Sequence, residues 1–259
     1  MLETRNLTIR FGGHVAVDHV SCAFAPGTLT AIVGPNGAGK TTYFNLISGQ
    51  LPASEGQVLL DGEDITRVPA PLRTRRGLGR AFQLTQLFPN LTVQENVRLA
   101  IQSRESGRGQ GGPLGGLDVW RVWLDRSAWI DEARAILDQV RLAGQHTAAA
   151  SSLPHGDQRK LEVALLIALA PKVFMFDEPT AGMSVDEVPV ILDLIRALKA
   201  RRDATILLVE HKMDVVRELA DRIIVLHNGA LVADGEPAAV IASPVVQQAY
   251  LGMVAEETQ

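Results

Sequence analysis

The stretch Gly34-Pro35-Asn36-Gly37-Ala38-Gly39-Lys40-Thr41 decides the fold, because it matches the pattern G-x-x-x-x-G-K-[ST] of a phosphate-binding loop. Its glycines let the backbone curl so that successive N–H groups point inward at a polyphosphate. Residues 28–33, just before it, are apolar and β-branched and predict a buried strand. Residues 42–48 predict a helix that ends at Gly49, and the N-terminal dipole of this helix favours anions. This strand–loop–helix order predicts nucleotide binding.

A second apolar run supplies the acids that such a loop needs. Residues 173–176 predict a buried strand, and Asp177 and Glu178 follow it directly. Next to a phosphate loop, Asp177 can hold Mg²⁺ together with the Thr41 hydroxyl, and Glu178 can accept a proton from an attacking water. Lys40 can place its charge on the β- and γ-phosphate oxygens. The alternative for the acid pair by itself is a helix-capping acid followed by a solvated one.

Composition limits the class of protein. The chain has 259 residues, 46% of them hydrophobic and 21% charged, as in ordinary globular proteins. The net charge of −4 gives no basic excess for nucleic acid. Residues 1–5 lack an apolar signal core, and no apolar run approaches the roughly 20 residues that span a bilayer. We therefore expect a cytoplasmic protein, and the single cysteine, Cys22, excludes an internal disulfide.

The remaining periodicities predict strands that alternate with helices, and hence an α/β fold with a mainly parallel sheet. Further strands are expected at 2–10, 16–24, 57–60, 204–209, 222–226 and 230–233, and helices at 127–140, 157–169 and 185–200. The first three of these strands can form a small antiparallel sheet. Arg73 to Arg76 form a basic patch, for which we favour a solvated face. Residues 103–116 predict a flexible surface loop, and the roles of Trp120, Trp123 and Trp129 stay open.

The order of motifs resembles the ATP-binding cassette superfamily over nearly the whole chain. The phosphate loop is followed by Gln83, by Leu-Pro-His-Gly-Asp-Gln at 153–158, by the acid pair and by His211. The resemblance implies a P-loop NTPase (RecA-like) core with an antiparallel β-subdomain and an inserted helical subdomain. The implied boundaries are 1–83 for the β-subdomain and the first part of the core, 84–160 for the helical subdomain, 161–235 for the rest of the core and 236–259 for a helical tail.

The resemblance also assigns roles by position. It implies that Glu178, His211 and Gln83 are catalytic and that Thr41, Gln83 and Asp177 hold Mg²⁺. It implies that ATP is held by Phe11, which stacks on adenine, and by Gly34, Pro35, Asn36, Gly37, Ala38, Gly39, Lys40, Thr41 and Thr42. A signature loop, with Leu153, His155, Gly156 and Asp157, would serve the nucleotide of a second subunit, and residues 181–184 would form the D-loop.

Three positions depart from the family pattern. Pro154 stands where Ser is usual and offers neither a hydroxyl nor an N–H to a γ-phosphate. Asp157 stands where Gln is usual, and either adds a negative charge near that phosphate or caps the helix. Ser184 stands where the D-loop usually has Asp. We therefore expect a weak signature loop and a second, different ATPase subunit with an unequal site.

Finer features resemble the ATPase subunits of branched-chain amino-acid importers, among them Arg10-Phe11-Gly12-Gly13 and the run Val209-Glu210-His211-Lys212. The expected partners are ATP, membrane permease subunits, a second ATPase subunit of the same or another kind and, indirectly, an extracytoplasmic solute-binding protein, but no nucleic acid. The expected location is the cytoplasmic face of the cell membrane. A cassette ATPase of a ribosome or nucleic-acid machine is the alternative, and a small-molecule kinase is a third reading.

Residues 84–96 are the expected dock for a membrane subunit, because they follow Gln83 directly. Leu87, Phe88 and Leu91 are the apolar candidates for that contact. The alternative, which we weigh equally, is that these three side chains pack inside the helical lobe.

Overall fold

The computed structural model describes residues 1–81, 87–108 and 126–248. The chain forms two compact units. The first combines residues 1–78 and 172–178 with the described residues from 195 onward, and the second combines 79–171 with 179–194. Strand β6 (Leu78–Ala81) and helix α7 (Val188–Ala200) each contain a boundary between the units.

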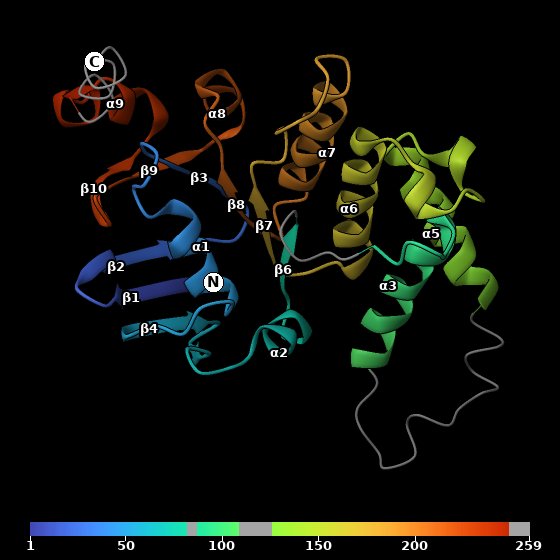
Figure 1. The fold of residues 1–259 in the computed structure, drawn as a ribbon, viewed down its shortest axis with the longest axis horizontal. Coiled ribbons are helices and arrows are strands. Elements are labelled where there is room, and N and C mark those ends of the chain that lie inside the picture. The colour runs from blue at the N-terminus through green and yellow to red at the C-terminus, as the bar shows by residue number, and fades with distance from the viewer. Residues whose placement is uncertain (82–86, 109–125, 249–259) are drawn as a thin grey trace. The chain divides into compact units, whose positions relative to one another are not determined.

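The first unit contains an antiparallel sheet with the strand order β2-β1-β4-β5 (Figure 1). Its strands are β1 (Leu2–Phe11), β2 (His14–Phe24), β4 (Glu55–Leu60) and β5 (Glu63–Asp64). These are the strands expected from residues 2–10, 16–24 and 57–60, with one short addition. The small antiparallel sheet is therefore confirmed.

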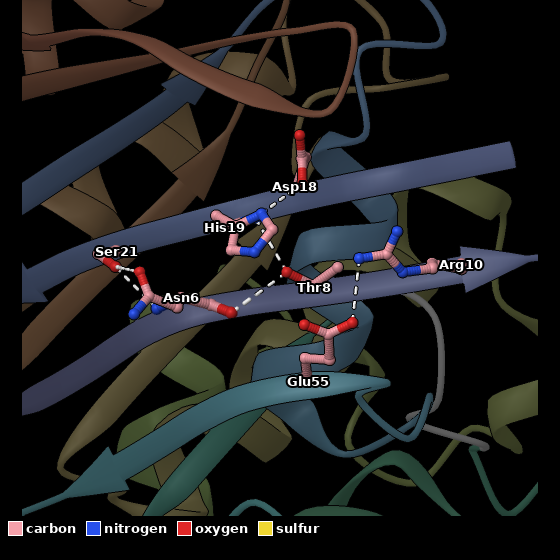
Figure 2. A network of polar contacts seen from close by, with 7 residues as sticks. All are labelled: Asn6, Thr8, Arg10, Asp18, His19, Ser21 and Glu55. Carbon is pink, nitrogen blue, oxygen red and sulfur yellow. Dashed lines mark hydrogen bonds and ion pairs between the residues drawn. The ribbon is translucent and has the colours of Figure 1, made fainter.

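Polar side chains form hydrogen bonds around an irregular stretch of this sheet, as Figure 2 shows. The register of β1 against β2 shifts after Thr4 and again after Leu7. Asn6 and His19 take left-handed φ angles of 47° and 52° nearby. The Thr8 hydroxyl accepts the His19 N–H at 3.0 Å and donates to the Asn6 carbonyl at 3.2 Å. The hydroxyl thus pairs backbone groups that the interrupted ladder leaves without strand partners.

A mainly parallel sheet forms the rest of the first unit. Its strand order there is β10-β9-β3-β8-β7, and only the β9–β10 pair is antiparallel. The strands are β3 (Leu29–Val33), β7 (Val173–Asp177), β8 (Thr205–Val209), β9 (Arg222–His227) and β10 (Ala230–Gly235). Helices α1 (Lys40–Ser48), α2 (Ala70–Arg75), α8 (Met213–Leu219) and α9 (Pro237–Ile241) belong to the same unit.

Helix α1 carries the core that joins the two sheets. Tyr43 and Phe44 are fully buried in one apolar cluster with residues from β1, β2, β3, β4, β7, β8 and β9. Gly49 ends the helix with a left-handed φ of 80°, as expected from its place after the last apolar residue. Burial of both faces explains why the strands of this sheet read as continuous apolar runs.

The basic patch is a correction to the sequence analysis. Arg73 is 2% exposed, whereas Arg75 and Arg76 are exposed. The Arg73 guanidinium donates to the carbonyls of Leu46 and Ile47 in α1, at 2.8 and 2.6 Å, and to those of two residues before α2. Burial lowers the pKa of Arg73 to about 10, so it stays protonated at neutral pH. A solvated face was the wrong expectation for this residue.

The second unit is mainly helical. Helices α3 (Val93–Arg108), α5 (Arg126–Gln139) and α6 (His155–Leu169) pack against one another (Figure 1). Two 3₁₀ turns, Ala143–Gln145 and Ala150–Ser152, lie between α5 and α6. The Arg104 guanidinium joins the three helices, because it binds both carboxylate oxygens of Glu132 at 2.7 and 2.9 Å and the Ala168 carbonyl at 2.9 Å.

The structure differs from two expectations for this part of the chain. A loop was expected from Ser103 onward, but α3 continues to Arg108. Residues 109–125, with Trp120 and Trp123, lie outside the described part of the chain. Trp129 is buried in α5. Helix α7 starts at Val188 rather than at 185, after a turn that Ser184 and Glu187 close. Within the described residues, no helix is both long and apolar enough to cross a membrane.

Candidate nucleotide site

The phosphate-binding loop follows β3 and needs its glycines for close packing. Gly34 has a φ of 149°, and a Cβ there would lie 2.1 Å from the Leu226 carbonyl oxygen. Gly39 has a φ of 95°, and a Cβ there would lie 2.4 Å from the Ala16 carbonyl oxygen. Both positions therefore exclude any larger residue. The loop passes directly into α1, whose N-terminal N–H groups and dipole suit an anion.

Lys40 is buried in this loop. Its Nζ donates to the Gly34 and Pro35 carbonyls at 2.7 and 2.8 Å, which uses two of its three N–H donors. Burial lowers the pKa of Lys40, and the nearby charges of Glu178 and Asp177 oppose that shift. The side chain is thus an ammonium held beside the loop with capacity for a further acceptor.

The parallel register brings the carboxyl ends of three strands together. Val209, the last residue of β8, pairs with Asp177 of β7 and with Ile32 of β3. The residues that follow these strands therefore meet at one edge of the sheet, as in other open parallel sheets. This register explains why the loop after β3 and the acids of β7 share one site.

Glu178 and His211 meet at this edge. His211 Nε2 lies 2.6 Å from Glu178 Oε1, although the two residues are 33 positions apart. Glu178 has a left-handed φ of 50°, and its N–H donates to the Val209 carbonyl at 2.9 Å. A non-glycine residue in the left-handed backbone conformation costs on the order of 1 kcal/mol of conformational energy. Such strained residues cluster at functional sites. The geometry aims the carboxylate at the histidine.

Glu210 fixes the turn that carries His211. Its side chain is 3% exposed, and Oε2 accepts the backbone N–H groups of His211 at 2.7 Å and Lys212 at 3.3 Å. Glu210 is a functional residue that the sequence does not single out. Its position before a histidine carries no signal by itself, because only the fold shows which N–H groups its carboxylate can reach.

The hairpin with Phe11 also reaches the loop. Phe11 ends β1 and is half-exposed, which leaves its ring free to stack on a base. The next strand, β2, contacts Gly229: the Asp18 N–H donates to the Gly229 carbonyl at 2.9 Å, and the Gly229 N–H donates to the Ala38 carbonyl at 3.1 Å. The turn at Asn228-Gly229, expected only as a hairpin, therefore also supports the phosphate loop.

Of the three residues expected to hold Mg²⁺, the structure describes two. The Asp177 carboxylate is buried at the end of β7, and Thr41 is exposed in the first turn of α1. A hydroxyl and a carboxylate oxygen are the hard ligands that Mg²⁺ takes alongside phosphates, so the two residues fit that ion. Gln83 lies outside the described residues. Within the described residues, no group of three or more His, Cys, Asp or Glu side chains is placed to hold a metal ion.

The signature residues lie at the start of α6 in the second unit. Pro154 and His155 are exposed, and Leu153 and Gly156 are buried. Asp157 is 8% exposed, and its carboxylate binds Lys160 Nζ at 2.7 Å and Gln145 Nε2 at 2.9 Å. These two bonds outweigh burial and lower the pKa of Asp157.

The charge of Asp157 is therefore paired with Lys160 inside the unit, and α6 has no side-chain hydrogen bond at its N-cap. The effect of Asp157 on a phosphate of a second subunit stays a prediction.

A parallel sheet with a glycine loop after β3, a buried lysine and paired acids after β7 define a P-loop nucleotide-binding protein. A family model described as ABC transporter matches residues 17–181. The chain belongs to this family of ATP-binding cassette proteins. The expected family and the P-loop NTPase fold class are both confirmed.

Relatives match over almost the full length. The chain is 36% identical over 252 residues to "High-affinity branched-chain amino acid transport ATP-binding protein BraF" of Pseudomonas aeruginosa and to the corresponding LivG protein of Escherichia coli K12, covering 97% of this chain and 98% of each relative. A solved nucleotide-free ATP-binding cassette from an ABC transporter is 30% identical, with a TM-score of 0.78 over 96% of this chain and 98% of that one. A cassette in its ADP conformation is 31% identical, with the same TM-score over 97% and 98%.

Proposed function

We propose that this chain is the subunit that binds and hydrolyses ATP to energise an ABC importer. The observation that carries the proposal is the Glu178–His211 pair, 2.6 Å apart, at the same sheet edge as the loop that buries Lys40. A carboxylate held beside a histidine can accept a proton from water, and a lysine in a glycine loop can neutralise phosphate charge. The two functions lie in one unit of the fold.

Each residue has a role in this proposal. Glu178 is the general base, and His211 holds its carboxylate until nucleotide enters. Lys40 turns its remaining N–H capacity to the β- and γ-phosphates. Thr41 and Asp177 hold Mg²⁺, which when bound withdraws charge from the phosphate oxygens. Gln83 completes the proposed metal and water contacts, and Phe11 stacks on adenine.

The solute proposal rests on the relatives. BraF and LivG are named as high-affinity branched-chain amino acid transport proteins, and they match this chain from end to end. We extend this to branched-chain or other hydrophobic amino acids and related amides. The partners proposed with it are membrane permease subunits, a second ATPase subunit and, indirectly, an extracytoplasmic solute-binding protein. The chain then acts on the cytoplasmic face of the membrane. The ribosomal or nucleic-acid alternative has no supporting observation, because the net charge is −4.

The described part of the proposed dock presents an aromatic ring. Phe88 is 55% exposed, whereas Leu87 and Leu91 are partly buried. Buried Asn96 clamps the backbone there: its Oδ1 accepts the Phe88 N–H at 2.8 Å, and its Nδ2 donates to the carbonyls of Phe88 and Thr92 at 3.1 and 3.0 Å. A fixed backbone that holds an aromatic ring in solvent favours docking over packing for Phe88.

Cysteine crosslinking tests the importer proposal. The chain's own Cys22 is buried, so Phe88→Cys adds one accessible thiol. In native membranes we expect a short reagent with one thiol-reactive end and one photoreactive end to join this variant to a multispanning protein, identified by mass spectrometry. Leu72→Cys is the control, because Leu72 is an apolar residue of similar exposure, 44%, on α2. If Phe88→Cys captures no membrane protein beyond what Leu72→Cys captures, the proposed dock is wrong.

The signature loop gives a second prediction. Pro154 lacks the donor that a serine would offer to a γ-phosphate, and a hydrogen bond to a charged group contributes about 1.5–3 kcal/mol. We expect Pro154→Ser to raise ATP turnover of the isolated chain by roughly tenfold. Asp157→Gln, which restores the residue usual at this position, should not help, since it leaves Lys160 without its closest carboxylate. Steady-state hydrolysis at matched protein concentration decides, and brisk wild-type turnover without a gain in Pro154→Ser contradicts the prediction.

A further inference from the structure

Two loops of the second unit touch through one carboxylate. We call residues 153–157 the signature turn and residues 181–184 the D-loop. Glu187, three residues after the D-loop, lies against Gly156 so closely that a Cβ on Gly156 would be 2.1 Å from Oε1 and 2.3 Å from Oε2. The Glu187 carboxylate therefore rests on Gly156, and a larger residue there would push this carboxylate away.

The same carboxylate holds the end of the D-loop. Glu187 Oε2 accepts the Ser184 N–H at 3.1 Å and the Ser184 hydroxyl at 3.0 Å, and the Glu187 N–H donates to the Ser184 carbonyl at 3.0 Å. The backbone N–H of Ser184, with its hydroxyl, lowers the pKa of Glu187, so the carboxylate stays ionised at neutral pH. The pattern S-x-x-E is a capping-box signature that was visible in the sequence.

Lys160 joins this carboxylate to the signature turn. Its Nζ lies 2.7 Å from Asp157 Oδ1 and 3.5 Å from Glu187 Oε1, and its side chain is 11% exposed. One poorly solvated cation thus sits between two carboxylates that would otherwise repel each other. Gln145 Nε2 holds the second oxygen of Asp157 at 2.9 Å. The contacts run without a gap from the signature turn through Lys160 and Glu187 to the D-loop.

We propose that Lys160 and Glu187 are positioning residues that hold the signature turn and the D-loop as one rigid block, preformed to receive the nucleotide-loaded face of a second ATPase subunit. This rests on the proposed function. Two loops that had to be ordered separately on association would each cost conformational entropy, and a block that is already ordered avoids that cost. Pro154 and His155 of the signature turn and Ala181 and Gly182 of the D-loop are exposed, and a Cβ on Gly182 would lie 3.5 Å from His155 Nε2.

The test measures association and nucleotide binding separately. The background is Glu178→Gln, in which ATP should persist and hold two subunits together. Light scattering over a concentration series gives the ATP-dependent dimer affinity, and titration with a fluorescent ATP analogue in dilute monomer gives nucleotide affinity. We expect Lys160→Met to weaken dimerisation by roughly tenfold and to leave monomer nucleotide affinity within about twofold. Lys160→Arg should recover most of the loss, because it restores the cation.

A double variant separates positioning from simple destabilisation. Lys160→Met leaves the Asp157 and Glu187 carboxylates unneutralised, so adding Glu187→Gln should cost less than the sum of the two single effects. Glu132→Gln is the matched control: it removes one carboxylate from the Arg104 pair in the same unit and should leave dimerisation unchanged. Urea unfolding of each variant corrects for any unfolded fraction.

The outcomes are distinct. A Glu178→Gln dimer that is weakened by Lys160→Met or Glu187→Gln, but not by Glu132→Gln, supports the block. Equal dimer affinity in Lys160→Met and Glu132→Gln overturns the inference and leaves the proposed function standing. If Glu178→Gln binds the ATP analogue but does not dimerise, the block as a receptor for a second copy of this chain is overturned and the proposed function stands. If the chain does not bind the ATP analogue at all, the proposed function fails with it.

Discussion

Glu178→Gln should reduce ATP turnover by about 10²–10⁴-fold, because it removes the general base and keeps its shape. The amide can still accept a hydrogen bond from His211 and still fits a left-handed backbone that the Val209 carbonyl holds. It cannot take a proton from water at neutral pH. We therefore expect unchanged ATP binding, slow hydrolysis and a dimer that accumulates in the presence of MgATP.

The control for this variant removes the same charge from the same unit. Glu55 forms an exposed ion pair with Arg10 at 3.0 Å on the antiparallel sheet (Figure 2). Glu55→Gln therefore makes the same change in net charge in the same unit, at a residue with no proposed contact to nucleotide. Phosphate release and calorimetric ATP titration are measured for both. Hydrolysis by Glu178→Gln at the rate of Glu55→Gln would falsify the assignment of Glu178 as the base.

Local signals explain which parts of this fold could be predicted. The strand before the phosphate loop, the helix stop at Gly49 and the hairpin at Asn228-Gly229 depend on a few neighbouring residues, and the structure contains all three. The place of Glu178 after a buried strand, in a chain with a phosphate loop, predicts its role, whereas His211 gains a role only from its order along the chain. Their 2.6 Å approach follows from the parallel register of β7 with β8, which single-strand periodicity does not reveal.

Long-range burial explains what could not be predicted. Nothing local shows that Lys160 and Gln145 enclose the Asp157 carboxylate. Glu187 was overlooked although its capping pattern was visible, since its contact with Gly156 joins two separate segments. Charged side chains are rarely buried, so a run of basic residues favours a solvated face. That expectation is wrong for Arg73, which is buried.

Arg73 holds the C-terminal end of the helix that begins at Lys40. Its guanidinium donates to Leu46 and Ile47 in the last turn of α1, at 2.8 and 2.6 Å, where a cation also meets the negative end of the helix dipole. Its other donors reach the carbonyls of Val68 and Thr66 at 2.8 and 2.6 Å. A Cβ at Gly49 would lie 2.7 Å from Arg73 Nε, so the helix stop and the arginine fit one another.

We therefore expect Arg73→Met to lower the free energy of unfolding by about 3 kcal/mol, measured by urea denaturation. Four carbonyls lose a charged donor, and the gain from no longer burying a guanidinium offsets only part of that loss. Arg73→Lys should recover a fraction, because an ammonium lacks the planar fork that reaches several carbonyls at once. Arg75→Met is the matched control: Arg75 is exposed two residues on, and the change should stay within about 0.5 kcal/mol. Equal stability of the two methionine variants would mean that water satisfies the carbonyls of α1 and that Arg73 contributes nothing to the end of this helix.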